Sequence, residues 1–240
     1  MSEAINWKHG AVGHKFVASY SGGKDSTLAL YKAMQAGEAV GLIMMLEEEG
    51  KRSRSHGMPP EIIQAQAESI ALPIFTAATS WEDYERNFMR LLAEAKHQGA
   101  EVLVTGDLDV PVEDCWHDRV TRNAGLGLGM PLWEMDHRDA VEEFINLGFV
   151  TMLVTVNLEL GMSEDDLGRI LTQEYVDELV ARGIDPCGEG GEFHTTVIDG
   201  PLFKHPIPIR KCGILRDGKY AFLPLELEQG PQDNNKKTLR

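Results

Sequence analysis

The chain has 240 residues, of which 42% are hydrophobic and 25% are charged, so it can bury the core of one large domain or of two modest ones. Its net charge of −15 argues against nucleic acids and anionic membranes as partners, because both attract clustered Lys and Arg. The three cysteines are far apart and form no C-x-x-C pair, so the sequence predicts no zinc ribbon. No apolar run resembles a signal peptide or a membrane span, which predicts a cytoplasmic protein.

The first half begins with a pattern typical of a strand, a glycine-rich turn and a helix. Residues 1–14 are short of apolar groups, and we expect them to be a flexible N-terminus. The apolar run at 16–20 predicts a strand, and Leu28, Tyr31 and Met34 recur after it at helical spacing. The turn between this strand and this helix is the first candidate site.

That turn reads Ser21-Gly22-Gly23-Lys24-Asp25-Ser26. Adjacent glycines let the backbone approach a ligand closely, and the N-terminus of the following helix favours an anion. Lys24 adds a positive charge, the two serines add hydroxyl donors, and Asp25 is suited to hold Mg²⁺ that bridges to a phosphate. The turn therefore predicts a phosphate-binding loop, although it lacks the leading glycine of a Walker A loop. The alternative is a capped Gly-Gly turn before a helix.

Strands and helices alternate up to about residue 130, which predicts an α/β fold with a doubly wound, Rossmann-like parallel sheet. The further predicted elements are strands at 40–46, 72–77 and 101–105 and helices at 59–71, 81–97 and 113–123. Ligands of such sheets bind beyond the carboxyl ends of the strands, where the strand order reverses. If the first and fourth strands are neighbours, Gly106 and Asp107 lie beside the glycine-rich turn. We count Leu46, Gly106 and Asp107 among the nucleotide-binding residues, and Asp107 could equally serve a metal.

The composition changes after about Pro131, which divides the chain into a first domain at 15–132 and a smaller α+β domain at 133–228. The predicted elements of the second domain are helices at 138–147 and 163–182, a strand at 149–156, and a hairpin that turns at Asp217-Gly218. Residues 229–240 form a polar tail. No low-complexity linker separates the two parts, so we expect them to pack closely.

A second unusual stretch, residues 185–195, combines glycines with two carboxylates, a thiol and a histidine. Glu189 and Glu192 can accept hydrogen bonds from an amine or ammonium, and His194 can move a proton near neutral pH. Cys187 lies in the same stretch, but a nucleophilic role would need a base and a lowered pKa. The spacing is not specific for a metal, so an acidic turn with a surface histidine is the alternative.

Both stretches resemble those of known families. Residues 21–26 are similar to the pyrophosphate-binding (PP) loop of the N-type ATP pyrophosphatases, and residues 188–195 resemble the second signature of the diphthine–ammonia ligase family. The likeness continues through the segments Gly106-Asp107-Leu108, Pro131-Leu132-Trp133 and Asp199-Gly200-Pro201-Leu202-Phe203. It covers roughly residues 15 to 205, and paired motifs in this order are very specific.

The resemblance implies an ATP-binding PP-loop domain followed by a substrate domain. It further implies an enzyme that adenylates a carboxylate, releases pyrophosphate and forms an amide with ammonia, with ATP and Mg²⁺ as cofactors. The implied catalytic residues are Lys24, Asp25, Glu189, Glu192 and His194, with Asp25 as the Mg²⁺ ligand. The implied acceptor is diphthine on an elongation factor, and ammonium supplies the nitrogen. Members of the family commonly self-associate, so a homo-oligomer is a further expectation.

One segment differs from the family pattern, at residues 52–59 after the second strand. Archaeal and eukaryotic members usually carry an aromatic- and Met-bearing loop here, whereas this loop looks like that of bacterial relatives, whose hosts have no diphthamide. A small-molecule carboxylate, for example a cobalamin-related one, is therefore an alternative acceptor. Lys51, Arg52 and Arg54 either contact an anionic substrate or form a solvated loop. A tRNA sulfurtransferase shares the phosphate loop, but this sequence has neither the cysteine pairs nor the basic composition usual for that class.

Overall fold

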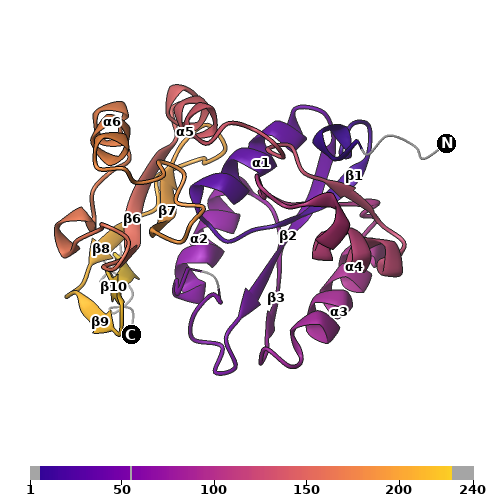
Figure 1. The fold of residues 1–240 in the computed structure, drawn as a ribbon. Helices are drawn as coiled ribbons and strands as arrows, with labels where there is room; N and C mark the ends of the chain where they lie inside the picture. The colour runs from indigo at the N-terminus through magenta and orange to yellow at the C-terminus, as the bar shows by residue number, and fades with distance from the viewer. Residues whose placement is uncertain (1–5, 55, 229–240) are drawn as a thin grey trace, which may run out of the picture.

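The first half of the chain forms a parallel sheet at the centre of Figure 1, in a computed structural model that describes residues 6–54 and 56–228. The predicted polar tail and residues 1–5 lie outside these described residues. The strand order is β3-β2-β1-β4-β5. The strands are β1 (Lys15–Ser19), β2 (Glu38–Leu46), β3 (Ile74–Ala78), β4 (Val102–Val104) and β5 (Gly127–Gly129).

Helices cover both faces of this sheet because successive strand residues point to opposite sides. Phe16 and Ala18 face one apolar cluster, together with α1 (Lys24–Met34) and α2 (Pro60–Ile70). Val17 between them faces the other cluster, with α3 (Tyr84–His97) and α4 (Trp116–Ala124). A sheet buried on both faces explains why the predicted strands read as continuous apolar runs.

The predicted reversal of strand order is confirmed. β1 pairs in parallel with β2 on one side and with β4 on the other, so the loops after β1 and β4 lie side by side at the carboxyl edge. The strand β5 was not predicted, because its sequence Gly-Leu-Gly is short and has no alternating apolar pattern.

The second half contains antiparallel sheets and two helices, α5 (His137–Asn146) and α6 (Gln173–Ala181). A four-stranded sheet has the order β7-β6-β10-β9, and a two-stranded sheet joins β11 and β8. The strands are β6 (Val150–Asn157), β7 (Phe193–Asp199), β8 (Ile209–Lys211), β9 (Leu215–Asp217), β10 (Tyr220–Phe222) and β11 (Leu225–Leu227). The predicted hairpin at Asp217-Gly218 is confirmed as the turn between β9 and β10.

The prediction of one long helix at 163–182 is wrong. A single 3₁₀ turn at Glu164–Asp166 is followed by an extended segment in which Ile170 pairs with Met152 of β6. Gly168 has a φ of +77°, a left-handed conformation that ends the turn. Thr172 then caps α6 by accepting from the Tyr175 N–H. The apolar residues at helical spacing therefore serve two elements.

The expectation of a loosely held N-terminus is also corrected for residues 7–14. Trp7 begins a 3₁₀ turn and is only 6% exposed, because its ring packs edge-on against Trp133 at 4.9 Å between centroids. The Trp7 carbonyl accepts from the Met130 N–H at 2.7 Å. Among the described residues, no helix is both long and apolar enough to cross a bilayer.

The two halves share one apolar core. The cluster that contains Leu28 of α1 and Ile63 of α2 continues without interruption into Phe144 of α5 and Val154 of β6. In Figure 1, α1 and α2 lie between the parallel sheet and the strands β6 and β7. The second half therefore packs on the helices of this face, and the candidate site lies where β7 meets the loop after β1.

Candidate active site at the junction of the two halves

The glycine-rich loop after β1 is held by its own hydroxyl groups. Ser21 Oγ lies 3.0 Å from Ser26 Oγ, which also donates to the Gly23 carbonyl at 3.1 Å. Thr27 Oγ1 donates to the same carbonyl at 2.8 Å. Gly22 has a φ of +80°, so the loop requires glycine there. These bonds fix the loop in one shape, and its binding of phosphate stays a prediction.

Strand β7 of the second half packs directly on this loop. The Val197 N–H donates to the Gly22 carbonyl at 2.9 Å, and the Lys24 N–H donates to Thr195 Oγ1 at 3.1 Å. Gln66 of α2, fully buried, donates through Nε2 to the carbonyls of Gly22 and Val197. Sequence reasoning missed Gln66, which belongs to no recognisable pattern, and it gave no role to Thr195 at the end of the stretch 185–195.

Lys24 is buried, with 4% of its surface exposed. Its Nζ donates to Asp25 Oδ2 at 2.8 Å and to the carbonyl of Cys187. Burial opposes the charge, but the carboxylate of Asp25 and the neighbouring Cys187 and Glu189 outweigh it and raise the pKa of Lys24. Lys24 is therefore a fixed cation that joins the phosphate loop to the stretch 185–195.

Gly106 brings the loop after β4 against the same place. A Cβ on Gly106 would lie 2.7 Å from the carbonyl carbon of Asp25 and 2.8 Å from the Ser26 nitrogen. Asp107 is next along the chain, with Oδ2 3.3 Å from His117 Nδ1. Leu46 lies at the end of β2, where its carbonyl accepts from the Thr79 N–H at 3.2 Å. Its contact with a nucleotide stays a prediction.

The stretch 185–195 lies over the phosphate loop and encloses a cavity of about 200 Å³. The cavity is lined by Lys24, Asp25, His56, Cys187, Glu189 and His194, together with neighbouring glycines, Phe193 and Thr195. The structure thus brings four of the five predicted catalytic residues together. Glu192 does not line the cavity, and its Oε2 is buried with no hydrogen-bond partner among the described residues.

Glu189 has a carboxyl group adapted to gain and lose a proton near neutrality. Desolvation first, and then the negative charge of Asp25, raise its pKa to about 7, although part of the residue is exposed. Burial likewise raises the pKa of the Cys187 thiol, which keeps it protonated and makes it a poor nucleophile. Ligand atoms of Asp25, Cys187 and Glu189 lie within 4.8 Å of one another.

His194 stacks on His56 with 4.7 Å between the ring centroids. His56 Nδ1 lies 2.9 Å from the Thr195 carbonyl. Burial lowers the pKa of His56 to about 4 and that of His194 to about 3, and the nearby Lys24 charge acts in the same direction on both. The expectation that His194 moves a proton near neutral pH is therefore corrected, because the ring is neutral there and is a weak base.

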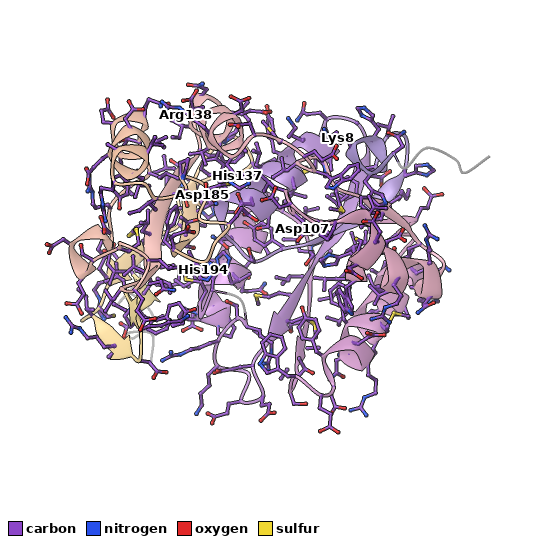
Figure 2. All side chains as sticks on the ribbon, in the orientation of Figure 1. Lys8, Asp107, His137, Arg138, Asp185 and His194 are labelled. Atoms are coloured by element: carbon purple, nitrogen blue, oxygen red, sulfur yellow. The ribbon has the colours of Figure 1, made fainter. Side chains whose placement is uncertain are left out.

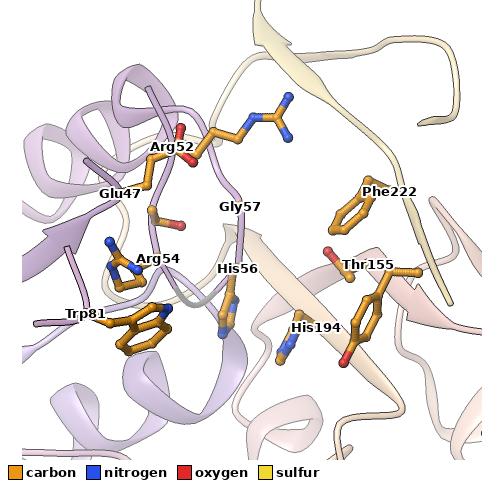
Figure 3. A pocket seen from close by; sticks show the side chains of 11 residues that line it. Glu47, Arg52, Arg54, His56, Gly57, Trp81, Thr155, His194 and Phe222 are labelled. Carbon is orange, nitrogen blue, oxygen red and sulfur yellow. The ribbon is translucent and has the colours of Figure 1, made fainter. Parts of the chain in front are cut away.

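The histidine pair separates the small cavity from a larger one of about 510 Å³, shown in Figure 3. One wall is the loop after β2, where the Arg54 guanidinium lies 4.4 Å from the Trp81 ring centroid. The opposite wall comes from the second half, with Thr155 of β6 and Phe222 of β10. Both cavities share His56 and His194, so they meet at the pair.

Comparison with known proteins shows the family of the chain. A family model described as the diphthamide synthase N-terminal domain matches residues 14–128, and one described as the diphthamide synthase C-terminal domain matches residues 136–227. The chain belongs to the diphthamide synthase family.

Relatives of this diphthamide synthase family member are named diphthine–ammonia ligases. The Schizosaccharomyces pombe protein is 29% identical over 219 residues, which cover 80% of this chain and 36% of that protein. The human protein is 26% identical over 237 residues, with 88% of each chain covered, and the Danio rerio protein is 27% identical, with 88% and 92% covered. The chain therefore spans about a third of the fission yeast relative and most of the other two.

A solved structure from Methanocaldococcus jannaschii, described as a predicted subunit of tRNA methyltransferase, covers 78% of this chain and 97% of its own. Its TM-score of 0.42 and identity of 14% are too low to bear on function.

Replacing Gly106 in this family member tests the contact between the two loops. We expect Gly106→Ala to weaken ATP binding at least about tenfold and to cost about 1–3 kcal/mol of stability, because the added methyl collides with backbone that cannot turn aside. Calorimetric titration and thermal unfolding measure the two effects. Gly213→Ala is the control, since that glycine has open space around it. Wild-type ATP affinity in Gly106→Ala would contradict the arrangement.

The neutral histidine pair predicts a loss of stability in acid. Both folded-state pKa values lie below the ordinary 6.5, so the unfolded chain binds more protons and stability falls as the pH drops from about 6.5 towards 4. The paired change His56→Gln with His194→Gln should flatten this fall by about 2 kcal/mol in urea unfolding followed against pH. His9→Gln, at an exposed histidine, should leave it unchanged. An equally steep fall in the paired variant would show that the rings are not held neutral.

Proposed function

We propose that this chain is an ATP-dependent ligase that converts a carboxylate into an amide with ammonia, and that diphthine on an elongation factor is the acceptor. One observation carries the proposal: the buried Lys24 joins the phosphate loop to the stretch bearing Glu189. The family match and the names of the relatives support the same chemistry. We further propose that residues 15–132 bind ATP and residues 133–228 bind the acceptor.

The residues present fit Mg²⁺. This ion prefers oxygen ligands and usually takes one or two carboxylates together with substrate phosphates, and Asp25 offers a carboxylate in this cavity. The protonated thiol of Cys187 is not a ligand that suits it. When bound, Mg²⁺ would neutralise charge on the phosphates of ATP.

The first chemical step forms an acyl-adenylate. A carboxylate oxygen of the acceptor attacks the α-phosphorus of ATP, and the bond to the β-phosphate breaks to release pyrophosphate. The Lys24 ammonium is fixed and dry, so it can stabilise the negative charge that develops on the departing pyrophosphate without reorganising. Helix α1 begins at Lys24 itself, so the positive end of the helix dipole lies beside this ammonium group.

The second step replaces AMP by ammonia. Ammonium must lose a proton before its nitrogen can attack the carbonyl carbon, and the carbon–oxygen bond to AMP then breaks. Glu189, with a pKa of about 7, is the group matched to this task. His194, with a pKa of about 3, is not, and we assign it to the wall between the two cavities. The larger cavity in Figure 3 is where we place the remainder of the acceptor.

Asp25 tests the phosphate site. We expect Asp25→Asn to keep the fold and to lower the production of AMP and pyrophosphate by about 10²-fold or more, because a neutral amide neither pairs with Lys24 nor binds Mg²⁺. Product analysis by chromatography gives the rate, and Asp165→Asn on the exposed 3₁₀ turn is the control. Formation of ADP in place of AMP, or full turnover in Asp25→Asn, would overturn the proposed reaction.

Glu189 tests the nitrogen step. In the wild type, kcat/KM for ammonium should rise with pH through about 7 as Glu189 ionises, and glutamine should not replace ammonium. Glu189→Gln should lower kcat/KM for ammonium about 10–100-fold and remove its rise with pH, while the Kd for ATP stays within twofold. Mass spectrometry identifies the amide on the diphthine-bearing elongation factor, and Glu159→Gln, at an exposed position outside the cavity lining, is the control. A thiolated product, or an amide made from glutamine alone, would refute the proposal.

A further inference from the structure

His137, the first residue of α5, bridges the two halves of the chain. Its Nδ1 lies 2.9 Å from Asp185 Oδ2, and its Nε2 lies 2.8 Å from Asp109 Oδ2. Asp109 belongs to the loop after β4, two residues beyond Asp107, whereas Asp185 opens the stretch that carries Glu189. Figure 2 shows His137 and Asp185 side by side near Asp107, between the two halves.

Both ring nitrogens of His137 therefore face carboxylate oxygens. An ionised carboxylate only accepts hydrogen bonds, and a neutral imidazole has a single N–H to donate, so the bridge is complete only when the ring is an imidazolium. Partial burial opposes the charge, but Asp185 and Asp109 outweigh it and raise the pKa of His137. The charged or titratable groups that face this ring are Asp109, Asp185 and, at longer range, Glu189.

Asp185 connects His137 to the backbone that lines the cavity. Its Oδ1 accepts from the Cys187 N–H at 3.0 Å, and its Oδ2 accepts from the Glu189 N–H at 3.0 Å. The carbonyl of Cys187 in turn accepts from Lys24 Nζ. A continuous series of hydrogen bonds thus runs from the loop after β4, through His137 and Asp185, to the backbone on which Glu189 stands and to the phosphate loop.

We infer that His137 is a positioning residue for amide formation: as a bridging imidazolium it holds the Glu189 loop over the phosphate loop. The inference rests on the function proposed above. When the ring loses its proton, one of the two bridges is lost and the backbone at Cys187 and Glu189 is released. Amidation then declines on the alkaline side, whereas ATP binding, which depends on residues 21–26 and 106–107, does not.

The first test needs no acceptor. Long-range ¹H–¹⁵N NMR of the whole chain reports the protonation of each His137 nitrogen, and amide hydrogen exchange reports the N–H groups of Cys187 and Glu189. We expect both nitrogens to be protonated at pH 7.5. His137→Phe should speed exchange at these two amides at least tenfold, with the amides of the parallel sheet unchanged.

The second test uses a variant that keeps the histidine. Asp109→Asn removes one of the two charges, so the pKa of His137 should fall towards its ordinary value of about 6.5. The alkaline limb of kcat/KM for ammonium should move to lower pH with it, while the Kd for ATP stays within twofold. His14→Gln is the matched control, because His14 pairs with the single carboxylate of Glu101 at the opposite edge of the sheet.

The outcomes separate the two proposals. A His137 ring with one protonated nitrogen at pH 7.5, or unchanged amide exchange in folded His137→Phe, would overturn the positioning role even if the enzyme makes the amide. An alkaline limb that stays in place in Asp109→Asn would overturn it as well, since a purely structural contact would change the rate without moving the limb. Failure of the wild-type protein to amidate, with the exchange results as expected, would instead overturn the proposed function.

Discussion

The structure depends on one buried charge. Lys24 is buried away from water, and its ammonium group is stable there only because Asp25 and the Cys187 carbonyl accept hydrogen bonds from it. The first partner lies on the phosphate loop and the second in the stretch 185–195, so neutralising this charge also fixes the distance between them. Two further hydrogen bonds act in the same direction: the Val197 N–H donates to the Gly22 carbonyl, and Thr195 Oγ1 accepts from the Lys24 N–H.

Around Lys24 the titratable groups divide into two kinds. His56 and His194 are kept neutral by burial and by the nearby cation, so they add no charge beside a site meant for phosphates. The pKa of Glu189 is displaced in the opposite direction, upwards to about 7, so this carboxyl group is close to half ionised at neutral pH. The same environment thus makes a histidine a weak base and a carboxylic acid an effective one, which inverts the roles that residue type alone suggests.

This inversion shows what could be predicted from the sequence. The glycine-rich turn and the stretch 185–195 were recognisable because glycines, acids and a lysine at short spacing are informative by themselves. The pairing of β1 with β4 followed from general rules for doubly wound sheets. The acid–base roles did not follow, because a pKa depends on burial and on residues far away in sequence, such as His56 beside His194. Gln66 and His137 were missed for the same reason, since Gln66 bonds to a residue 131 positions away and His137 to one 48 positions away. The long helix at 163–182 was wrong because Gly168 adopts a left-handed angle that apolar spacing does not reveal.

The shared apolar core has a consequence for how proteins of this architecture can diversify. The apolar cluster at α1 and α2 continues into α5 and β6 without a boundary. Exchanging either half for an unrelated module would therefore expose a large apolar surface on the other half. Under the proposed function, a change of acceptor would come through the loops that rim the larger cavity, above all through Glu47, Arg54 and His56, which belong to the first half and line this cavity together with residues of the second. The choice of acceptor would then depend on the half proposed to bind the nucleotide as much as on the half that follows it.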